Sequence, residues 1–190
     1  MKVALIGTAN SGKTTLIKEL EKRKTFKNHS VINEIAGGFP IAERPKLPTQ
    51  IKILSAQIEQ ESKYFNFISD RSVIDNTAYF MYHYKSSTNR QKAKIHDEYM
   101  SKFNAHMLTK PYDAVVFVGE YFTLEDNGIR DMDEGMQTWI YDALENISTV
   151  YCDVYNIPLY TIHGSIDERI KMLKGQLKPH YTQKRVTDFA

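Results

Sequence analysis

Residues 7–14 have the sequence Gly-Thr-Ala-Asn-Ser-Gly-Lys-Thr, which satisfies the pattern G-x-x-x-x-G-K-[ST] at every position. The apolar run from Lys2 to Ile6 precedes this segment, and a stretch with helical spacing follows it. Glycines let such a loop curl until successive N–H groups point inward, while the next helix directs its positive end to the same place. The sequence therefore predicts a phosphate-binding loop between a first strand and a first helix.

This loop is expected to hold ATP together with magnesium. Lys13 would reach the β- and γ-phosphates, and the hydroxyl of Thr14 would ligate Mg2+. The residues predicted to bind the nucleotide through the loop are Gly7, Thr8, Ala9, Asn10, Ser11, Gly12, Lys13, Thr14 and Thr15.

Beyond the loop, apolar β-branched runs alternate with longer stretches of helical spacing, which is typical of parallel strands joined by helices. The later strands are predicted to end at Glu34 and to span 64–69, 113–118 and 158–162. Helices are predicted over 12–24, from Thr49, over 73–84, around 95–107, over 139–154 with Val154 on the apolar face, and from Ser165. We therefore expect an α/β fold of three layers, with a mainly five-stranded parallel sheet flanked by helices and a short lid.

Composition limits the domain organisation and the compartment. A chain of 190 residues with 42% hydrophobic residues can bury one substantial core, so we predict one domain over 1–177, with a lid near 123–135 and a polar basic tail over 178–190. The apolar run from Val3 ends in the glycine-rich loop and forms no signal-peptide core, and no segment has the roughly 20 apolar residues of a membrane span. A lone cysteine, Cys152, excludes an intrachain disulfide and suits a reducing environment. We expect a soluble cytoplasmic protein.

Two classes of phosphate-loop protein can be excluded by motif. A GTP switch needs an Asp-x-x-Gly element and an Asn-Lys-x-Asp guanine reader, and the sequence contains neither. A ring-forming mechanical ATPase needs an apolar strand that ends in Asp-Glu. Asp97-Glu98 and Asp133-Glu134 do not follow such strands. The six histidines are scattered without metal-ligand spacing, so no zinc site is predicted.

An Asp-Arg-Ser sequence, residues 70–72, stands at the end of the predicted third strand. Together with the following residues 73–79, it resembles the corresponding stretch of the thymidylate kinase and deoxynucleoside kinase superfamily. The chain is more similar still to small kinases typified by the ribosylnicotinamide kinase domain and by phage nucleotide kinases. That group also has an acidic residue after the second strand, matched by Glu34, an arginine-bearing lid, matched by residues 126–131, and a Gly-Ser-x-x-x-Arg turn, matched by residues 164–169.

The resemblance implies roles for the charged residues in phosphoryl transfer. Asp70 would hold magnesium through its water shell or accept from Thr14, with a structural cap as the alternative. Arg71 would clamp the acceptor or the transferred phosphate, with an exposed ion pair as the alternative. Arg130 would close from the lid onto the γ-phosphate, with an exposed ion pair as the alternative. Glu34 would act as a general base or anchor an acceptor hydroxyl, with a purely structural carboxylate as the alternative.

The acceptor and the adenine are placed by the same resemblance. A base or pyridine ring would stack on Phe39 or Tyr79, and Asp75 would be a second acceptor contact, unless it serves as a helix cap. The adenine would rest near Ser165 and Ile166.

We therefore expect a kinase that moves the γ-phosphate of ATP to a nucleoside monophosphate or nucleoside, most readily a deoxynucleotide. Three alternatives stay open: a kinase acting on a DNA hydroxyl, such as a hydroxymethylated pyrimidine base or a DNA end, a ribosylnicotinamide kinase, and a non-catalytic ATP-binding sensor. The basic stretches 85–94 and 178–185 support the DNA alternative, although the net charge is only +2. No membrane partner is expected, and a homodimer stays open.

Overall fold

The computed structural model describes the backbone of residues 1–120 and 134–187, and the side chains of residues 1–120 and 135–178. The five strands are β1 (Lys2–Ile6), β2 (Ser30–Ile32), β3 (Phe67–Asp70), β4 (Ala114–Val118) and β5 (Leu159–Ile162). The helices are α1 (Lys13–Lys22), α2 (Leu47–Ser62), α3 (Val73–Ser86), α4 (Lys92–Leu108), α5 (Glu134–Val154) and α6 (Ile166–Thr187), with short 3-10 turns at Ala36–Gly38 and Ile41–Glu43.

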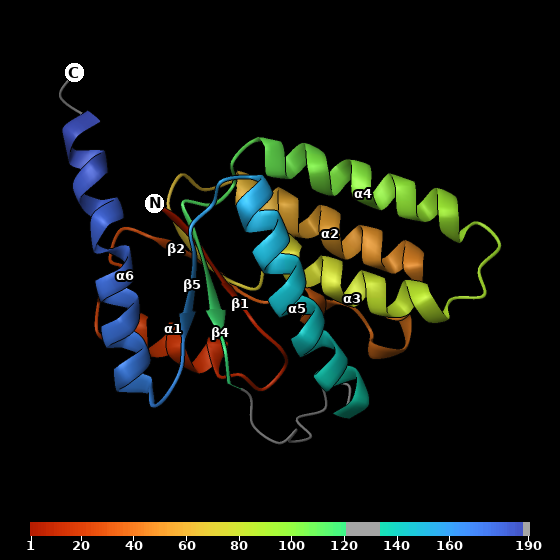
Figure 1. Ribbon diagram of the computed structural model, residues 1–190, viewed down its shortest axis with the longest axis horizontal. Helices are drawn as coiled ribbons and strands as arrows, with labels where there is room; N and C mark the ends of the chain where they lie inside the picture. The colour runs from red at the N-terminus through yellow and green to blue at the C-terminus, as the bar shows by residue number, and fades with distance from the viewer. Residues whose placement is uncertain (121–133, 188–190) are drawn as a thin grey trace.

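The strands form one sheet in the order β2-β3-β1-β4-β5, and all the strand pairs are parallel. Helices α1 and α6 cover one face, and helices α2 to α5 cover the other (Figure 1). The prediction of a three-layer α/β fold with a five-stranded parallel sheet is confirmed. Because β1 lies in the centre, the loop that follows it opens at the carboxyl edge of the sheet, where ligands bind in folds of this kind.

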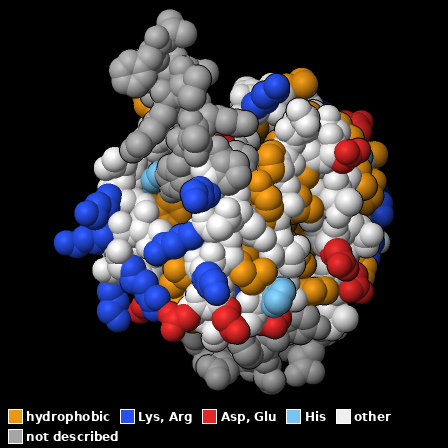
Figure 2. All heavy atoms as spheres, turned by 60° about the vertical axis from the view of Figure 1, so that its left-hand side comes forward, with side chains coloured by type: hydrophobic (Ala, Val, Ile, Leu, Met, Phe, Trp, Pro, Cys, Tyr) orange, Lys and Arg blue, Asp and Glu red, His pale blue; other side chains and the backbone are white. Residues whose placement is uncertain are grey.

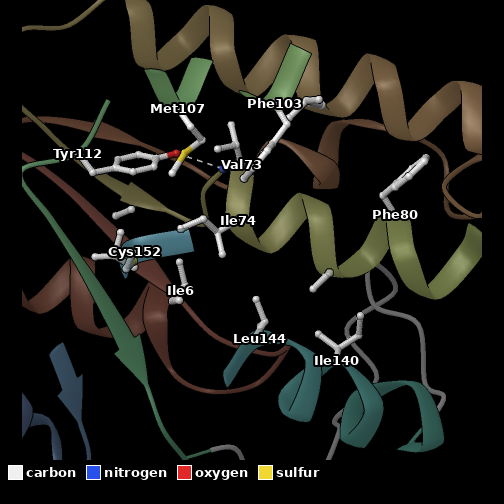
Figure 3. Packing of buried hydrophobic residues seen from close by; sticks show 14 of the residues in the cluster. Ile6, Val73, Ile74, Phe80, Phe103, Met107, Tyr112, Ile140, Leu144 and Cys152 are labelled. Atoms are coloured by element: carbon white, nitrogen blue, oxygen red, sulfur yellow. Dashed lines mark hydrogen bonds between the residues drawn. The ribbon is translucent and has the colours of Figure 1, made fainter. Parts of the chain in front are cut away.

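Alternation along the strands separates two apolar cores. In β1, Val3 and Leu5 face α1 and α6, whereas Ala4 and Ile6 face the larger helical layer. In this larger core, side chains of the sheet meet side chains of the helices that cover it. Ile6 of β1 lies near Ile74 of α3 and Leu144 of α5 (Figure 3). Since successive strand residues point to opposite faces, a buried central strand needs an apolar residue at every position, and β1 has one after Lys2.

Several predicted boundaries differ from the structure. The third strand begins at Phe67 and not at Tyr64, and the side chain of Phe65 is 91% exposed. Val154 does not belong to the apolar face of α5, because its side chain is 66% exposed. Helix α6 continues past residue 177 to Thr187, through part of the predicted tail. The predicted lid lies outside the described residues, except for its last two positions in α5.

Among the described residues, none of the helices combines the length and the apolar character that crossing a membrane requires.

Candidate active site

Two positions of the phosphate loop have backbone angles that favour glycine. Gly7 has φ +149° and Gly12 has φ +84°. A Cβ atom at Gly7 would lie 3.0 Å from Ser11 Oγ and 3.1 Å from the carbonyl oxygen of Val118. A Cβ atom at Gly12 would lie 3.0 Å from Nη1 of Arg169. Backbone conformation and close packing therefore both favour glycine at the two glycine positions of the sequence pattern.

The side chain of Lys13 folds into the loop. Its Nζ donates to the carbonyl oxygens of Gly7 (2.8 Å) and Thr8 (2.7 Å) and to Ser11 Oγ (3.0 Å). Burial, and then the neighbouring Arg71 cation, lower the pKa of Lys13 from 10.5 to about 8. Burial thus disfavours the charged form of Lys13, and an anion bound beside the loop would stabilise that charged form.

Thr14 and Asp70 form a pair of oxygen donors beside the loop. The hydroxyl of Thr14 donates to Oδ2 of Asp70, which is the last residue of β3. Oδ1 of Asp70 is buried and has no hydrogen-bond partner among the described residues. Mg2+ favours one or two protein oxygens together with phosphates and water, so this pair fits magnesium bound with a nucleotide. The described residues contain no cluster of three His, Cys, Asp or Glu side chains that would hold a metal by themselves.

Arg71 follows β3 with φ +83°, in the left-handed region that a non-glycine residue seldom adopts. Its Nε is 2.8 Å from Oε1 of Glu34, and its guanidinium lies 5.0 Å from the ring centroid of Tyr79. Arg71 also holds the pKa of Glu34 below its ordinary value of 4.5. The guanidinium is thus fixed at the edge of the sheet by a carboxylate on one side and an aromatic ring on the other.

Asp75 supports the loop from the first turn of α3. It forms a capping box with Ser72, and its Oδ1 accepts from the backbone N–H of Gly7 (3.1 Å). The side chain is fully buried, and this burial raises its pKa from 3.8 to about 6. Of the two roles weighed from the sequence, the geometry favours the helix cap.

A cavity of about 610 Å³ opens in front of these groups. Its walls come from the phosphate loop, α1, the segment between β2 and α2, α2 itself, the end of β3, α3 and the beginning of α5. Of the predicted site residues outside the loop, the cavity brings together Glu34, Asp70, Arg71 and Tyr79.

The other predicted site residues lie elsewhere. The described lining of the cavity does not include Phe39, Ser165 or Ile166. The carbonyl of Phe39 accepts from Arg44, and the hydroxyl of Ser165 pairs with Glu168 in a capping box at the start of α6. Arg130 lies outside the described residues.

The cavity also contains residues that the sequence analysis did not select. Lys18, Arg44, Asn76, His83 and Gln137 line it. Nδ2 of Asn76 is buried without a hydrogen-bond partner among the described residues. Asn76, Tyr79 and His83 are spaced i, i+3, i+7 along α3, and that spacing predicts a shared helix face. It could have identified Asn76 and His83 once Tyr79 was placed at the site.

Comparison with known proteins agrees with this architecture. A protein-family model described as an AAA domain matches residues 2–169. No curated protein matches the chain in sequence. The structure of deoxyadenosine kinase from M. mycoides with bound dCTP is similar, with a TM-score of 0.67 and 18% identity over 94% of this chain and 100% of that one. The same kinase with bound dATP has a TM-score of 0.66, again with 18% identity and with coverage of 94% and 100%. The likeness shows that the two proteins share the P-loop kinase fold.

Proposed function

The chain belongs to the AAA domain family, and from this membership together with the geometry of the cavity we propose that it is an ATP-dependent kinase. Its acceptor is a nucleoside monophosphate or a nucleoside. One observation carries the proposal: the loop, the Thr14–Asp70 pair and the Arg71–Glu34 pair face a single cavity that extends beyond them along α3. A protein that only hydrolysed ATP would need no space for a second ligand, whereas this cavity of about 610 Å³ continues from the loop to residues of α3 and α5.

The charges of the cavity favour an acceptor that carries a phosphate. Four cationic side chains line it, and two carboxylates oppose them: Lys13, Lys18, Arg44 and Arg71 against Glu34 and Asp70. The deoxyadenosine kinase structures were solved with dCTP, with dATP, and with dCMP and dCDP. The cationic lining favours a nucleoside monophosphate, whereas the likeness to a nucleoside kinase that was solved with dCMP as a product favours a nucleoside, so the proposal keeps both acceptors.

Phosphoryl transfer depends on positioning and on neutralising charge. We propose that Lys13 leaves the carbonyl oxygens of its own loop for the phosphates and that Arg71 binds the acceptor or the transferred group. Magnesium bound at Thr14 and Asp70 would supply charge neutralisation at the phosphate oxygens. Arg130 keeps its proposed role as a cation that closes on the γ-phosphate. Glu34 has a lowered pKa, which makes it a weak proton acceptor, so we propose that it anchors an acceptor hydroxyl.

The ring-ATPase alternative gains no support from the strand ends. β3 ends in Asp70, and the next residue is Arg71 and not a glutamate. The Asp97-Glu98 pair lies within helix α4.

The DNA alternative has one observation in its favour and two against it. Lys and Arg side chains gather over one half of the face shown in Figure 2. However, the segment between α3 and α4 and the far end of α6 lie on opposite sides of the sheet, so the two basic stretches form no common track (Figure 1). Lys85 also packs over the rings of Tyr82 and Trp139, at 4.5 and 4.3 Å from their centroids.

An acceptor panel tests the proposal. The protein would be incubated with ATP, magnesium and separate nucleosides, nucleoside monophosphates, ribosylnicotinamide and oligonucleotides that contain hydroxymethylated pyrimidines, and the products identified by mass. We expect acceptor-dependent ADP and a product heavier by one phosphate with a monophosphate. Lys13→Met should abolish turnover, whereas Lys22→Met, on the exposed end of the same helix, should retain it. No phosphorylated product from any acceptor would overturn the proposal, and steeply salt-dependent phosphorylation of oligonucleotides would favour the DNA alternative.

A further inference from the structure

Arg169 is a fully buried cation that lies behind the phosphate loop. Its side chain is 1% exposed, and it enters from the first turn of α6, which the Ser165–Glu168 capping box begins. Gly12 lines the cavity, whereas Arg169 is not among its lining residues. The guanidinium therefore contacts the loop from outside the cavity.

Each nitrogen of the guanidinium has a partner. Nε donates to the carbonyl oxygen of Gly164 (2.8 Å), Nη1 to the carbonyl oxygen of Ser11 (2.6 Å), and Nη2 to Oε2 of Glu120 (3.0 Å). The same Glu120 oxygen accepts from the backbone N–H of Gly164 (2.8 Å). Three segments, namely the loop, the end of β4 and the β5–α6 turn, thus converge on one side chain.

The bond to Ser11 has a direct consequence for the loop. A trans peptide is planar, so fixing the Ser11 carbonyl toward Arg169 directs the Gly12 N–H away from it, to the side of the cavity. A charged donor also polarises the peptide, which makes that N–H a stronger donor to an anion.

From this geometry we infer that Arg169 is a positioning residue for nucleotide binding: it fixes and polarises the Ser11–Gly12 peptide so that the Gly12 N–H is aimed at a phosphate. This role rests on the proposed function, because it requires that the loop binds a nucleoside di- or triphosphate. Arg169 itself would not touch the ligand. Its effect should appear in nucleotide affinity.

A neighbouring arginine supplies a matched control. Arg23 also joins the first turn of α6 to the rest of the protein, through Nη1 and Oδ1 of Asp167 at 2.7 Å. It lies at the end of α1 and its side chain is 41% exposed. Replacing it removes an arginine contact to the same turn of α6 without disturbing the Ser11 carbonyl.

The experiment measures ADP and magnesium–ATP affinity by calorimetry for wild type, Arg169→Lys, Arg169→Ala and Arg23→Ala, with thermal unfolding of each ligand-free protein. Lysine keeps the positive charge but cannot donate to the three acceptors in the planar geometry of a guanidinium. Arg169→Lys should therefore bind the nucleotide about tenfold more weakly than wild type, and Arg169→Ala more weakly still. Arg23→Ala should bind like wild type. Guanidinium ion, added at a concentration that does not unfold the protein, should restore affinity to Arg169→Ala and leave wild type unchanged.

The outcomes separate the inference from the proposed function. Wild type that binds no nucleotide would remove the proposed function. Wild-type affinity in folded Arg169→Lys, with only the unfolding temperature lowered, would overturn the positioning role and leave a structural one. If Arg169→Ala does not fold, Glu120→Gln provides the second test. This change removes the negative charge that pairs with Nη2 of Arg169, and it does so at a side chain that is 46% exposed and therefore tolerant of substitution. Unchanged affinity in both Glu120→Gln and Arg169→Lys would equally overturn the inference.

Discussion

Lys13 has two competing sets of partners, the carbonyl oxygens of its own loop and the phosphates of a bound nucleotide. In the ligand-free protein its ammonium is bonded to the carbonyls of Gly7 and Thr8, in a buried place that lowers its pKa to about 8. Phosphates offer a stronger, charged partner. Nucleotide binding should therefore raise this pKa and take up a proton where Lys13 is partly neutral.

This prediction can be checked by calorimetry of ADP binding at pH 8 to 9 in buffers with different ionisation enthalpies. We expect net proton uptake and weaker binding as the pH rises through 8. The stability of the ligand-free protein should change with pH in the opposite sense. The pKa of Lys13 in the folded state lies below its ordinary value of 10.5, so the unfolded state binds more protons between about pH 8 and 10.5. The contribution of Lys13 to the free energy of unfolding therefore increases as the pH rises through this range. Arg at position 13 cannot lose its proton, so Lys13→Arg should show neither effect. Buffer-independent enthalpies for wild type would contradict the account.

Asn76 lines the cavity with a side-chain amide that can donate a hydrogen bond to a ligand. Its Nδ2 is buried without a partner among the described residues, and an unpaired buried amide costs about 1 to 3 kcal/mol. A ligand that accepts a hydrogen bond there would relieve that cost. We therefore predict that Asn76→Ala lowers kcat/KM for the preferred acceptor about tenfold or more while leaving ADP affinity unchanged.

Steady-state kinetics with the acceptor found in the panel would check this prediction. Asn104→Ala is the matched control, since that asparagine lies on the exposed surface of α4. Equal losses for every acceptor and for ADP would indicate a general disturbance of the site instead of acceptor recognition.

At the scale of elements, the turn between β3 and α3 carries Asp70 and Arg71 and is supported by a buried polar network. Tyr112 accepts from the backbone N–H of Val73 (3.1 Å) and donates to Glu61 (2.8 Å), and His106 Nε2 lies 2.7 Å from Glu61. Figure 3 shows the Tyr112 hydroxyl reaching the start of α3. These contacts join α2, α4 and α3 behind the site.

We predict that Tyr112→Phe lowers the free energy of unfolding by about 1 to 3 kcal/mol, because it leaves the Val73 N–H without its acceptor and removes one of the donors to Glu61. Urea unfolding would measure this loss. Tyr155→Phe is the control, since its hydroxyl bonds only at the exposed surface, to Asn104 at 3.1 Å. If both variants lost equal stability, the buried network would have no special role.

The elements themselves were largely predictable from the sequence, because apolar runs and helical spacing are local. The first strand and the loop could be predicted with their correct bounds. The start of β3 could not, since Tyr64 and Phe65 continue the aromatic run although Phe65 is exposed. Periodicity alone also included Val154 on the buried face of α5, near the end of the helix, where the structure leaves it exposed.

The site could be predicted only in part, because only some of its residues stand in local sequence patterns. The loop, Asp70 and Arg71 stand in recognisable patterns at strand ends. Asn76, Arg44 and Gln137 meet only when the segment after β2, helix α3 and helix α5 come together. The contact between Arg169 and Ser11 joins residues 158 positions apart, and no local pattern predicts it.

On the scale of the whole molecule, helices from both faces of the parallel sheet take part in the site, and α1 also lines the cavity. Helices α1 and α6 lie on one face, and α6 supplies Arg169 to the loop from behind. On the other face, α2, α3 and α5 contribute to the walls of the cavity. The central claim is that this cavity receives a phosphate acceptor beside the nucleotide.

Tracing labelled phosphate tests that claim most directly. The protein would be given ATP labelled at the γ-phosphate, magnesium and the nucleoside monophosphate preferred in the panel, and the label would be followed into the nucleoside diphosphate and into inorganic phosphate. We predict that the label moves to the diphosphate, that turnover depends on the acceptor, and that Lys13→Met abolishes the transfer. Label found only in inorganic phosphate, at a rate that no acceptor changes, would contradict the account.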